Sequence, residues 1–220
     1  MSKIIYFCII KISFRMSANI SSKEDLMQQQ ILAAAKRLFQ VYGLAKVTMD
    51  DVAKAIGKGR SSLYYYYKSK DEIFDAVVHI EVREMLAAMT HATTQASGLE
   101  QKLRAFFLTK IEILRQKGAF FKALDVGMDA NALSEFQKTK IALHYLIVRQ
   151  ESALMKQLLT DSMSKGELRK MPDQELDVFI MVLLSSLRGF KRELELENDP
   201  TKVEPAVDMF TRMALYGLKN

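Results

Sequence analysis

Cysteine and histidine are scarce in this sequence, and each shortage excludes a class of site. Cys8 is the only cysteine, so no internal disulfide can form, and no cysteine spacing typical of a metal site is present. The three histidines, His79, His91 and His144, are too scattered along the chain to predict a metal trio. A chain without disulfides is typical of the reducing cytoplasm, which is the expected location.

Patterns typical of catalysis are also missing. We find no nucleophile elbow, no phosphate-binding glycine loop and no histidine–carboxylate spacing suited to a metal. The sequence therefore predicts that the protein is not an enzyme and that it needs no cofactor and no metal. A helical enzyme is the weakest of the alternatives.

Only three prolines occur in 220 residues, and no segment alternates apolar and polar residues as a half-buried strand does. Apolar residues make up 49% of the chain. The sequence therefore predicts an all-α protein of about nine helices, and its length suffices for a small head and one larger domain. Glycines at positions 98, 118 and 166 are expected to end helices, and residues 201–204 are expected to form the capping box of the last one.

The net charge of +6 is unevenly distributed along the chain. Residues 1–70 hold twelve basic and four acidic side chains, a net charge of +8, which leaves −2 for residues 71–220. A basic head on a nearly neutral body is typical of a module that binds a polyanion. Charge alone fits DNA, RNA and an acidic membrane surface equally well.

Residues 48–70, TMDDVAKAIGKGRSSLYYYYKSK, predict two short helices separated by a tight turn. Thr48 is a good N-cap residue, and Asp51 places a carboxylate in the first turn, near the positive end of the helix. Gly57 is expected to end this helix in a left-handed conformation. A second short helix follows over residues 60–67. Two helices joined by a short turn that contains glycine form the helix-turn-helix plan.

The second of these helices carries four consecutive tyrosines, residues 64–67, which cannot all share one face because successive helix residues turn by about 100°. Leu63 and Tyr67 share the face that can be buried against the domain. Ser61 and Tyr65 point the opposite way, between basic side chains at both helix ends. Hydroxyls and a guanidinium suit base edges in a major groove, and lysine suits phosphate. The alternative is that the tyrosines are packing groups and the lysines a solvated rim.

Residues 31–73 resemble the N-terminal domain of the TetR family of transcriptional regulators. The matching residues are Ile31, Ala34, Leu38, Phe39, Gly43, Thr48, Val52, Ala53, Gly57, Leu63, Tyr64, Lys68, Ser69, Lys70 and Ile73. The family often has Ser-Lys-Gly-Thr where this sequence has residues 59–62, and a phenylalanine where Tyr67 stands. These departures lie mainly on the groove-facing side, so they bear on which operator is recognised.

The resemblance implies a role for each matching position of the helix-turn-helix. The positions that contact bases in the family correspond to Arg60, Ser61, Ser62, Tyr65 and Tyr66. The positions that contact phosphates correspond to Thr48, Tyr64, Lys68 and Lys70. Double-stranded DNA is therefore the expected partner, and a phosphate at Thr48 also fits the positive end of a helix.

The chain is expected to have three parts. Residues 1–20 are expected to be a disordered N-terminal extension, of which residues 1–15 precede a more natural start at Met16, and an export signal is the alternative. Residues 21–70 form the predicted helix-turn-helix domain, and residues 71–220 form the predicted helical domain for regulation and dimerisation. No membrane partner is expected, because the apolar run over residues 4–10 is too short to span a bilayer.

The last two predicted helices, residues 173–197 and 201–217, have apolar faces broader than one body needs. Paired with a second copy they would form a four-helix bundle, and in the family this pair is the dimer interface. The alternative is that they only close the core of the monomer. The predicted interface residues are Phe179, Leu183, Ser186, Leu187, Phe190, Phe210 and Met213.

The family usually binds a small molecule within the helical body, and this sequence offers aromatic and methionine side chains suited to an adaptable apolar pocket. The candidate pocket residues are Met85, Met89, Phe106, Phe107, Phe120, Phe121, Met128, His144 and Tyr145. The alternative is that they are ordinary core residues.

Taken with the resemblance, the sequence predicts a ligand-responsive transcriptional regulator. It is expected to be a repressor that binds a palindromic operator as a homodimer and that a small apolar effector releases. The alternative is a helix-turn-helix protein whose body binds a protein partner and no metabolite.

Overall fold

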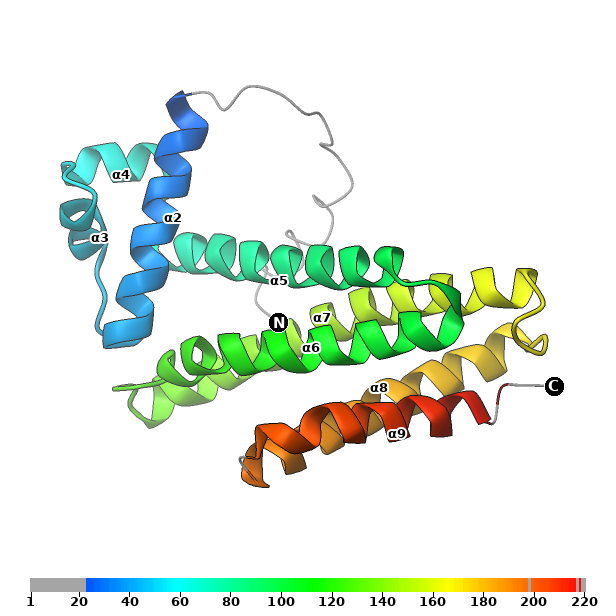
Figure 1. Ribbon diagram of the computed structural model, residues 1–220. Helices are drawn as coiled ribbons and strands as arrows, with labels where there is room; N and C mark the ends of the chain where they lie inside the picture. Colours follow the sequence, from blue (N-terminus) through cyan, green and yellow to red (C-terminus); the bar gives the residue numbers. More distant parts are fainter. Residues whose placement is uncertain (1–22, 198, 217, 219–220) are drawn as a thin grey trace. The chain divides into compact units, whose positions relative to one another are not determined.

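The computed structural model describes residues 23–197, 199–216 and 218, and all regular structure in these residues is helical (Figure 1). This confirms the predicted all-α class. The helices are α2 (Lys23–Tyr42), α3 (Met49–Ala55), α4 (Arg60–Tyr66), α5 (Lys70–Gln95), α6 (Gly98–Ala123), α7 (Ala130–Ser164), α8 (Asp173–Glu197), the 3-10 helix η1 (Pro200–Lys202) and α9 (Val203–Tyr216). The predicted disordered extension, residues 1–20, lies outside the described residues. Among the helices described, none is both long and apolar enough to cross a membrane.

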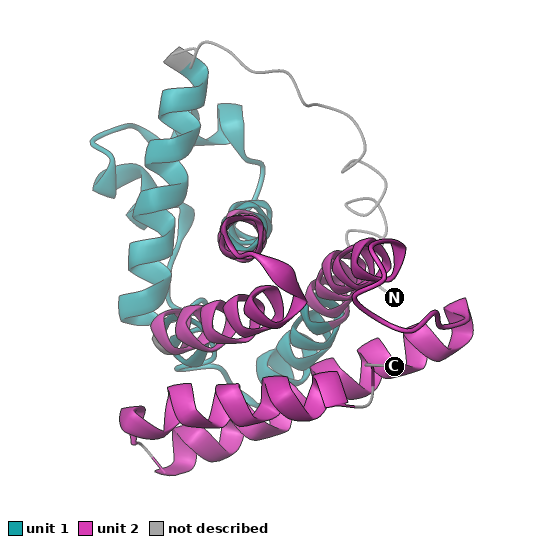
Figure 2. Cartoon of the chain, turned by 45° about the vertical axis from the view of Figure 1, so that its right-hand side comes forward, with its two compact units in different colours: residues 1–79, 120–144 teal, residues 80–119, 145–220 magenta. Residues whose placement is uncertain are grey.

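The chain divides into two compact units, shown in teal and magenta in Figure 2. Among the described residues, unit 1 comprises residues 23–79 and 120–144, and unit 2 comprises residues 80–119 and those from 145 onward. Helices α5, α6 and α7 each continue from one unit into the other. The predicted boundary at residue 70 separates two functions, DNA binding and regulation, and not two compact units. It stays a prediction.

The core of unit 1 forms where α2, α3 and α4 bury their apolar faces. Helix α2 contributes Ile31 and Phe39, helix α3 contributes Val52 and helix α4 contributes Leu63, all fully buried. The Phe39 ring meets Phe74 of α5 edge-on, with ring centroids 6.0 Å apart. Burial of these side chains stabilises α3 and α4, which at seven residues each are too short to persist alone in water.

The turn after α6 is also part of unit 1. The backbone N–H of Leu44, just after α2, donates to the carbonyl of Leu124 at 3.1 Å. Gly43 has a φ of +81°, and a Cβ at this position would lie 2.4 Å from the carbonyl oxygen of Val126. Only glycine tolerates both the left-handed conformation and so close a backbone. The end of α2 is therefore fixed against the turn that follows α6.

Unit 2 has an apolar core with one ion pair buried inside it. Phe106 and Phe107 of α6 are fully buried, and Phe107 lies against Phe210 of α9 with ring centroids 5.0 Å apart. The ammonium of Lys110 on α6 donates to Glu151 on α7 at 2.5 Å, and the two side chains are only 3% and 1% exposed.

Two predicted helix boundaries are wrong. Helix α6 runs through Gly118 to Ala123 without a break, because Gly118 is not among the glycines with positive φ and a helix tolerates one glycine at a cost of about 1 kcal/mol. The last helix is not capped by the predicted box. Asp199 instead caps η1 by accepting from the backbone N–H of Thr201, and Glu204 accepts from Arg104.

Candidate nucleic-acid interface

The N-terminus of α3 is held by a complete capping box. The backbone N–H of Asp51 donates to the Thr48 hydroxyl at 3.2 Å, and the Asp51 carboxylate accepts the backbone N–H of Thr48 at 2.9 Å. The Thr48 hydroxyl also donates to this carboxylate at 2.6 Å, and these bonds hold the pKa of Asp51 below its usual range. Thr48 is exposed, as a phosphate-contacting residue must be, but its hydroxyl already has internal partners.

The turn between α3 and α4 forms at Gly57, whose φ is +66°. Its N–H donates to the carbonyl of Lys54, and the N–H of Lys58 donates to the carbonyl of Ala53, both at 3.0 Å. These bonds satisfy the last carbonyls of α3, as expected where a helix ends in a left-handed residue. Gly59 then caps α4 with extended backbone and no side-chain bond.

Helix α4 presents its predicted face to solvent. Leu63 is fully buried beneath it, whereas Ser61, Ser62 and Tyr65 are exposed, with Tyr65 at 68%. Tyr64 and Tyr66 are half-buried. The tyrosines at the predicted base-contacting positions are therefore accessible, although their contacts with DNA stay a prediction.

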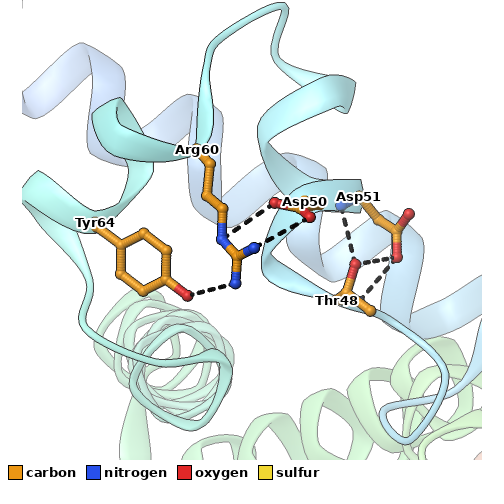
Figure 3. A network of polar contacts seen from close by, with 5 residues as sticks. All are labelled: Thr48, Asp50, Asp51, Arg60 and Tyr64. Atoms are coloured by element: carbon orange, nitrogen blue, oxygen red, sulfur yellow. Dashed lines mark hydrogen bonds and ion pairs between the residues drawn. The ribbon is translucent and has the colours of Figure 1, made fainter.

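Arg60 lies between two partners at the start of α4 (Figure 3). Its Nη1 donates to Asp50 Oδ2 at 3.4 Å, its Nε lies 3.3 Å from Asp50 Oδ1, and its Nη2 donates to the Tyr64 hydroxyl at 3.2 Å. The guanidinium also lies over the Tyr64 ring, 5.4 Å from its centroid. The Tyr64 hydroxyl and the Asp50 carboxylate raise the pKa of Arg60 above its ordinary value. Because a hydroxyl both donates and accepts, Tyr64 can accept from Arg60 and still donate to a phosphate.

Tyr65 has a carboxylate partner on α2. Its hydroxyl donates to Glu24 Oε1 at 3.3 Å, and its ring meets Tyr66 edge-on with centroids 5.0 Å apart. The nearby Glu24 charge raises the pKa of Tyr65, so its hydroxyl stays protonated and can donate. Contact with a base edge would replace the long hydrogen bond to Glu24.

The two lysines at the predicted phosphate positions both contact the backbone. Lys68 donates to the carbonyl of Tyr64 at 3.0 Å and is exposed. Lys70 donates to the carbonyl of Leu44 at 2.7 Å and to that of Ala45 at 3.3 Å, and it is only half-exposed. Lys70 therefore ties the start of α5 to the segment after α2, and Lys68 is the more accessible of the two for a phosphate.

Sequence reasoning did not single out Asp50 or Glu24, the two carboxylates that contact Arg60 and Tyr65. Asp50 lies ten residues before Arg60, and Glu24 lies 41 residues before Tyr65. No local pattern reports contacts across such separations, and only the folded helix-turn-helix brings the partners together.

The predicted effector-pocket residues are divided between the two units. Unit 2 holds Met85, Met89, Phe106 and Phe107, all buried, and Tyr145, which is exposed. Unit 1 holds four more, of which Phe120 is buried, Phe121 and Met128 are half-buried and His144 is exposed. A groove of about 300 Å³ between α7 and α8 is lined by other residues, among them Val148, Met181 and Arg188. The pocket stays a prediction.

The predicted dimer residues differ in their accessibility. Leu183 and Leu187 are 5% and 1% exposed within the single chain, which argues against a place for them in an interface between copies. Phe179 is half-buried, and the rings of Phe190 and Phe210, also half-buried, stack at 6.0 Å.

The exposed apolar surface of α8 and α9 includes one predicted dimer residue and several residues that were not predicted. Ser186 and Met213 of the predicted set are exposed. The further exposed apolar side chains here are Val178, Met181, Val182, Leu196, Met209 and Tyr216. On α8, Val178, Met181 and Val182 recur at positions i, i+3 and i+4. On α9, Met209, Met213 and Tyr216 recur at i, i+4 and i+7, so each helix has an exposed apolar stripe. The two helices lie side by side in both views of the chain (Figures 1 and 2).

Residues 31–77 match the family model for bacterial regulatory proteins of the tetR family. The chain is 23% identical over 191 residues to the uncharacterized HTH-type transcriptional regulator YhgD of Bacillus subtilis, an alignment that covers 86% of this chain and 94% of YhgD. It is also 23% identical over 201 residues to the HTH-type transcriptional repressor AcnR of Corynebacterium jeikeium, covering 88% of this chain and 95% of AcnR. These matches confirm the resemblance noted in the sequence.

Solved structures show the same fold. SmeT, the repressor of the Stenotrophomonas maltophilia multidrug efflux pump SmeDEF, is 18% identical and superposes with a TM-score of 0.62 over 88% of this chain and 90% of SmeT. SmeT in complex with triclosan superposes with a TM-score of 0.60 at 18% identity, over 89% of this chain and 92% of SmeT.

Proposed function

We propose that this chain, which belongs to the TetR family of bacterial regulatory proteins and is a transcriptional regulator, represses its targets by binding a palindromic operator as a dimer. A small apolar effector would release it from the operator. Repression is the activity in the name of AcnR and in the description of SmeT. A DNA-binding role also places the protein in the cytoplasm.

The observation that carries this proposal is the exposed polar face of α4. Arg60 and Tyr65 stand on it with side-chain donors, and Leu63 anchors the helix from beneath. A helix fits the major groove, where base edges present patterns of donors and acceptors that distinguish all four base pairs. Exposed lysines at the helix ends, such as Lys58 and Lys68, suit the flanking phosphates.

The apolar stripes of α8 and α9 support a dimer. Met181 on α8 and Met213 on α9 are more than half exposed, and burial against a second copy would remove both from water. A twofold pair presents two recognition helices about 34–36 Å apart, one turn of DNA. A palindromic operator follows from this symmetry.

The proposed effector is a small apolar molecule. SmeT, whose fold this chain shares, has been solved with triclosan bound. Buried methionine and phenylalanine side chains of the helical body, such as Met89 and Phe107, are suited to surround an apolar ligand. A thermal-shift screen with lipophilic compounds tests this step, and stabilisation by none of them would favour a protein partner for the body.

The test of the DNA-binding role begins by sequencing the genomic DNA that the purified protein retains. Binding of that DNA and of a scrambled duplex is then measured by fluorescence anisotropy across a salt series. Arg60→Ala should lower the preference for the retained site by about tenfold to a hundredfold, because it removes a base contact. Lys68→Ala should weaken both duplexes alike and reduce the salt slope by about one.

Two outcomes would contradict the proposal. A wild-type protein that binds both duplexes equally has no operator. An Arg60→Ala variant that loses the same affinity on both duplexes does not use this residue to recognise a base.

A further inference from the structure

An acidic side chain stands within the basic face that is proposed to meet DNA. Asp50 lies in the first turn of α3, and its side chain is 48% exposed. It is not the capping residue, because Asp51 makes both bonds of the capping box with Thr48. A carboxylate beside the phosphate backbone weakens binding to every DNA sequence, so its position needs another explanation.

We propose that Asp50 is a positioning residue for base recognition, which holds the Arg60 guanidinium in the orientation that meets a guanine. The inference rests on the proposed function of α4 as a recognition helix. Asp50, on α3, contacts Nη1 and Nε of Arg60, while the Tyr64 hydroxyl, on α4 itself, accepts from Nη2 (Figure 3). The guanidinium is thus held from two sides by groups on two different helices.

The donors of Arg60 are divided in a way that suits this role. A guanidinium has five N–H groups, two on each terminal nitrogen and one on Nε. Asp50 accepts from Nη1 and Tyr64 accepts from Nη2, so each terminal nitrogen keeps a second hydrogen. A bidentate contact with O6 and N7 of guanine needs two such donors. The internal contacts therefore fix the plane of the guanidinium and leave enough donors for the base.

Fixing the side chain before binding should favour the correct sequence. An unrestrained arginine loses rotamer freedom when it meets a base, and it can turn instead to a phosphate on any sequence. Asp50 reduces that loss and opposes the turn toward phosphate. The smaller loss and the opposed turn both raise the ratio of specific to non-specific binding. The negative charge of Asp50 lowers affinity for every DNA sequence alike and leaves this ratio unchanged.

The experiment measures the ratio of specific to non-specific DNA affinity for wild type, Asp50→Asn, Arg60→Ala and the double variant. The duplexes are the retained genomic site, the same site with each G·C pair exchanged in turn, and a scrambled duplex. Asp71→Asn is the matched control, because it makes the same change of charge at an exposed aspartate of unit 1 that does not contact Arg60. Thermal melting of each variant reports whether α3 has lost stability.

Asp50→Asn should lower discrimination by about twofold to fivefold, the range expected for an exposed ion pair. The loss should fall at the same base pair at which Arg60→Ala loses discrimination. The double variant should discriminate no worse than Arg60→Ala alone, because Asp50 acts through Arg60. Asp71→Asn should keep the wild-type ratio.

Three outcomes would overturn the positioning role. These are an unchanged or higher ratio in Asp50→Asn, a loss spread evenly over all base pairs, and losses that add in the double variant. The even loss, with a lower melting temperature, would assign Asp50 to the stability of α3. Equal binding of all duplexes by the wild type would remove the proposed function and this inference together. Wild-type selectivity that Asp50→Asn leaves intact would remove this inference alone.

Discussion

Glu151→Gln should destabilise the protein far more than loss of a surface ion pair. Glu151 and Lys110 are almost completely buried, and burial lowers the pKa of Lys110 even though Glu151 opposes the shift. The amide variant leaves the lysine charge buried without its counter-charge. Breaking a buried pair in this way costs about 3–5 kcal/mol. For a chain of this size the melting temperature should fall by about 6–20 °C.

The assay is thermal and urea unfolding of wild type and variants at fixed protein concentration. Glu112→Gln is the control, since Glu112 pairs with Arg115 on the exposed side of α6, and its melting temperature should change by less than about 2 °C. Replacing both buried partners, with Lys110→Met and Glu151→Leu, should restore most of the stability, because apolar side chains of similar volume carry no desolvation cost.

The loss of stability in Glu151→Gln, relative to wild type, should also depend on pH. Loss of the carboxylate lowers the folded-state pKa of Lys110 further below its ordinary value of 10.5. At a pH between the folded-state pKa of Lys110 and 10.5, the unfolded chain binds more protons than the folded one. The stability of the variant therefore rises with pH in this range. The deficit should therefore be smaller at pH 9.5 than at pH 7. Equal midpoints for Glu151→Gln and Glu112→Gln, or a double variant as unstable as Glu151→Gln, would refute this reasoning.

Three further predictions concern other parts of the chain. Gly43→Ala should destabilise unit 1 by about 2 kcal/mol or more in urea unfolding, and Gly57→Ala by only about 1 kcal/mol, because both have positive φ but only Gly43 has backbone atoms within reach of a Cβ. Asp51→Asn should lower the melting temperature at pH 7, and its difference from wild type should vanish as the pH falls below 3.8 through the depressed folded-state pKa of Asp51. Met213→Glu should shift the proposed dimer to monomer in sedimentation, whereas Ala88→Glu, at an exposed position on α5, should not.

Local features of the fold were predictable from the sequence. The N-cap at Thr48 and its box with Asp51 involve residues only three apart, so they follow from residue type and spacing. The buried and exposed sides of α4 follow from the angle between successive helix residues, and Leu63 and Tyr65 lie on the expected sides.

Other features depend on contacts between distant segments, which a single sequence does not reveal. The ion pair of Lys110 with Glu151 joins residues 41 apart, and the bond from Leu44 to Leu124 joins residues 80 apart. Glycine is ambiguous for a related reason. Gly57 adopts a positive φ and ends its helix, whereas Gly118 continues one, and the surrounding structure decides between the two.

The attachment of the α2 end to residues 124–126 has a consequence for protein engineering. A chimaera that grafts residues 23–70 alone onto the body of a relative would cut through unit 1. It would place Gly43 and Leu44 against a foreign turn, whose backbone carbonyls would have to lie where those of Leu124 and Val126 lie in this chain. A chimaera that carries residues 120–144 together with residues 23–79 keeps this contact native. Operator specificity should therefore be exchanged between relatives by moving both segments of the chain.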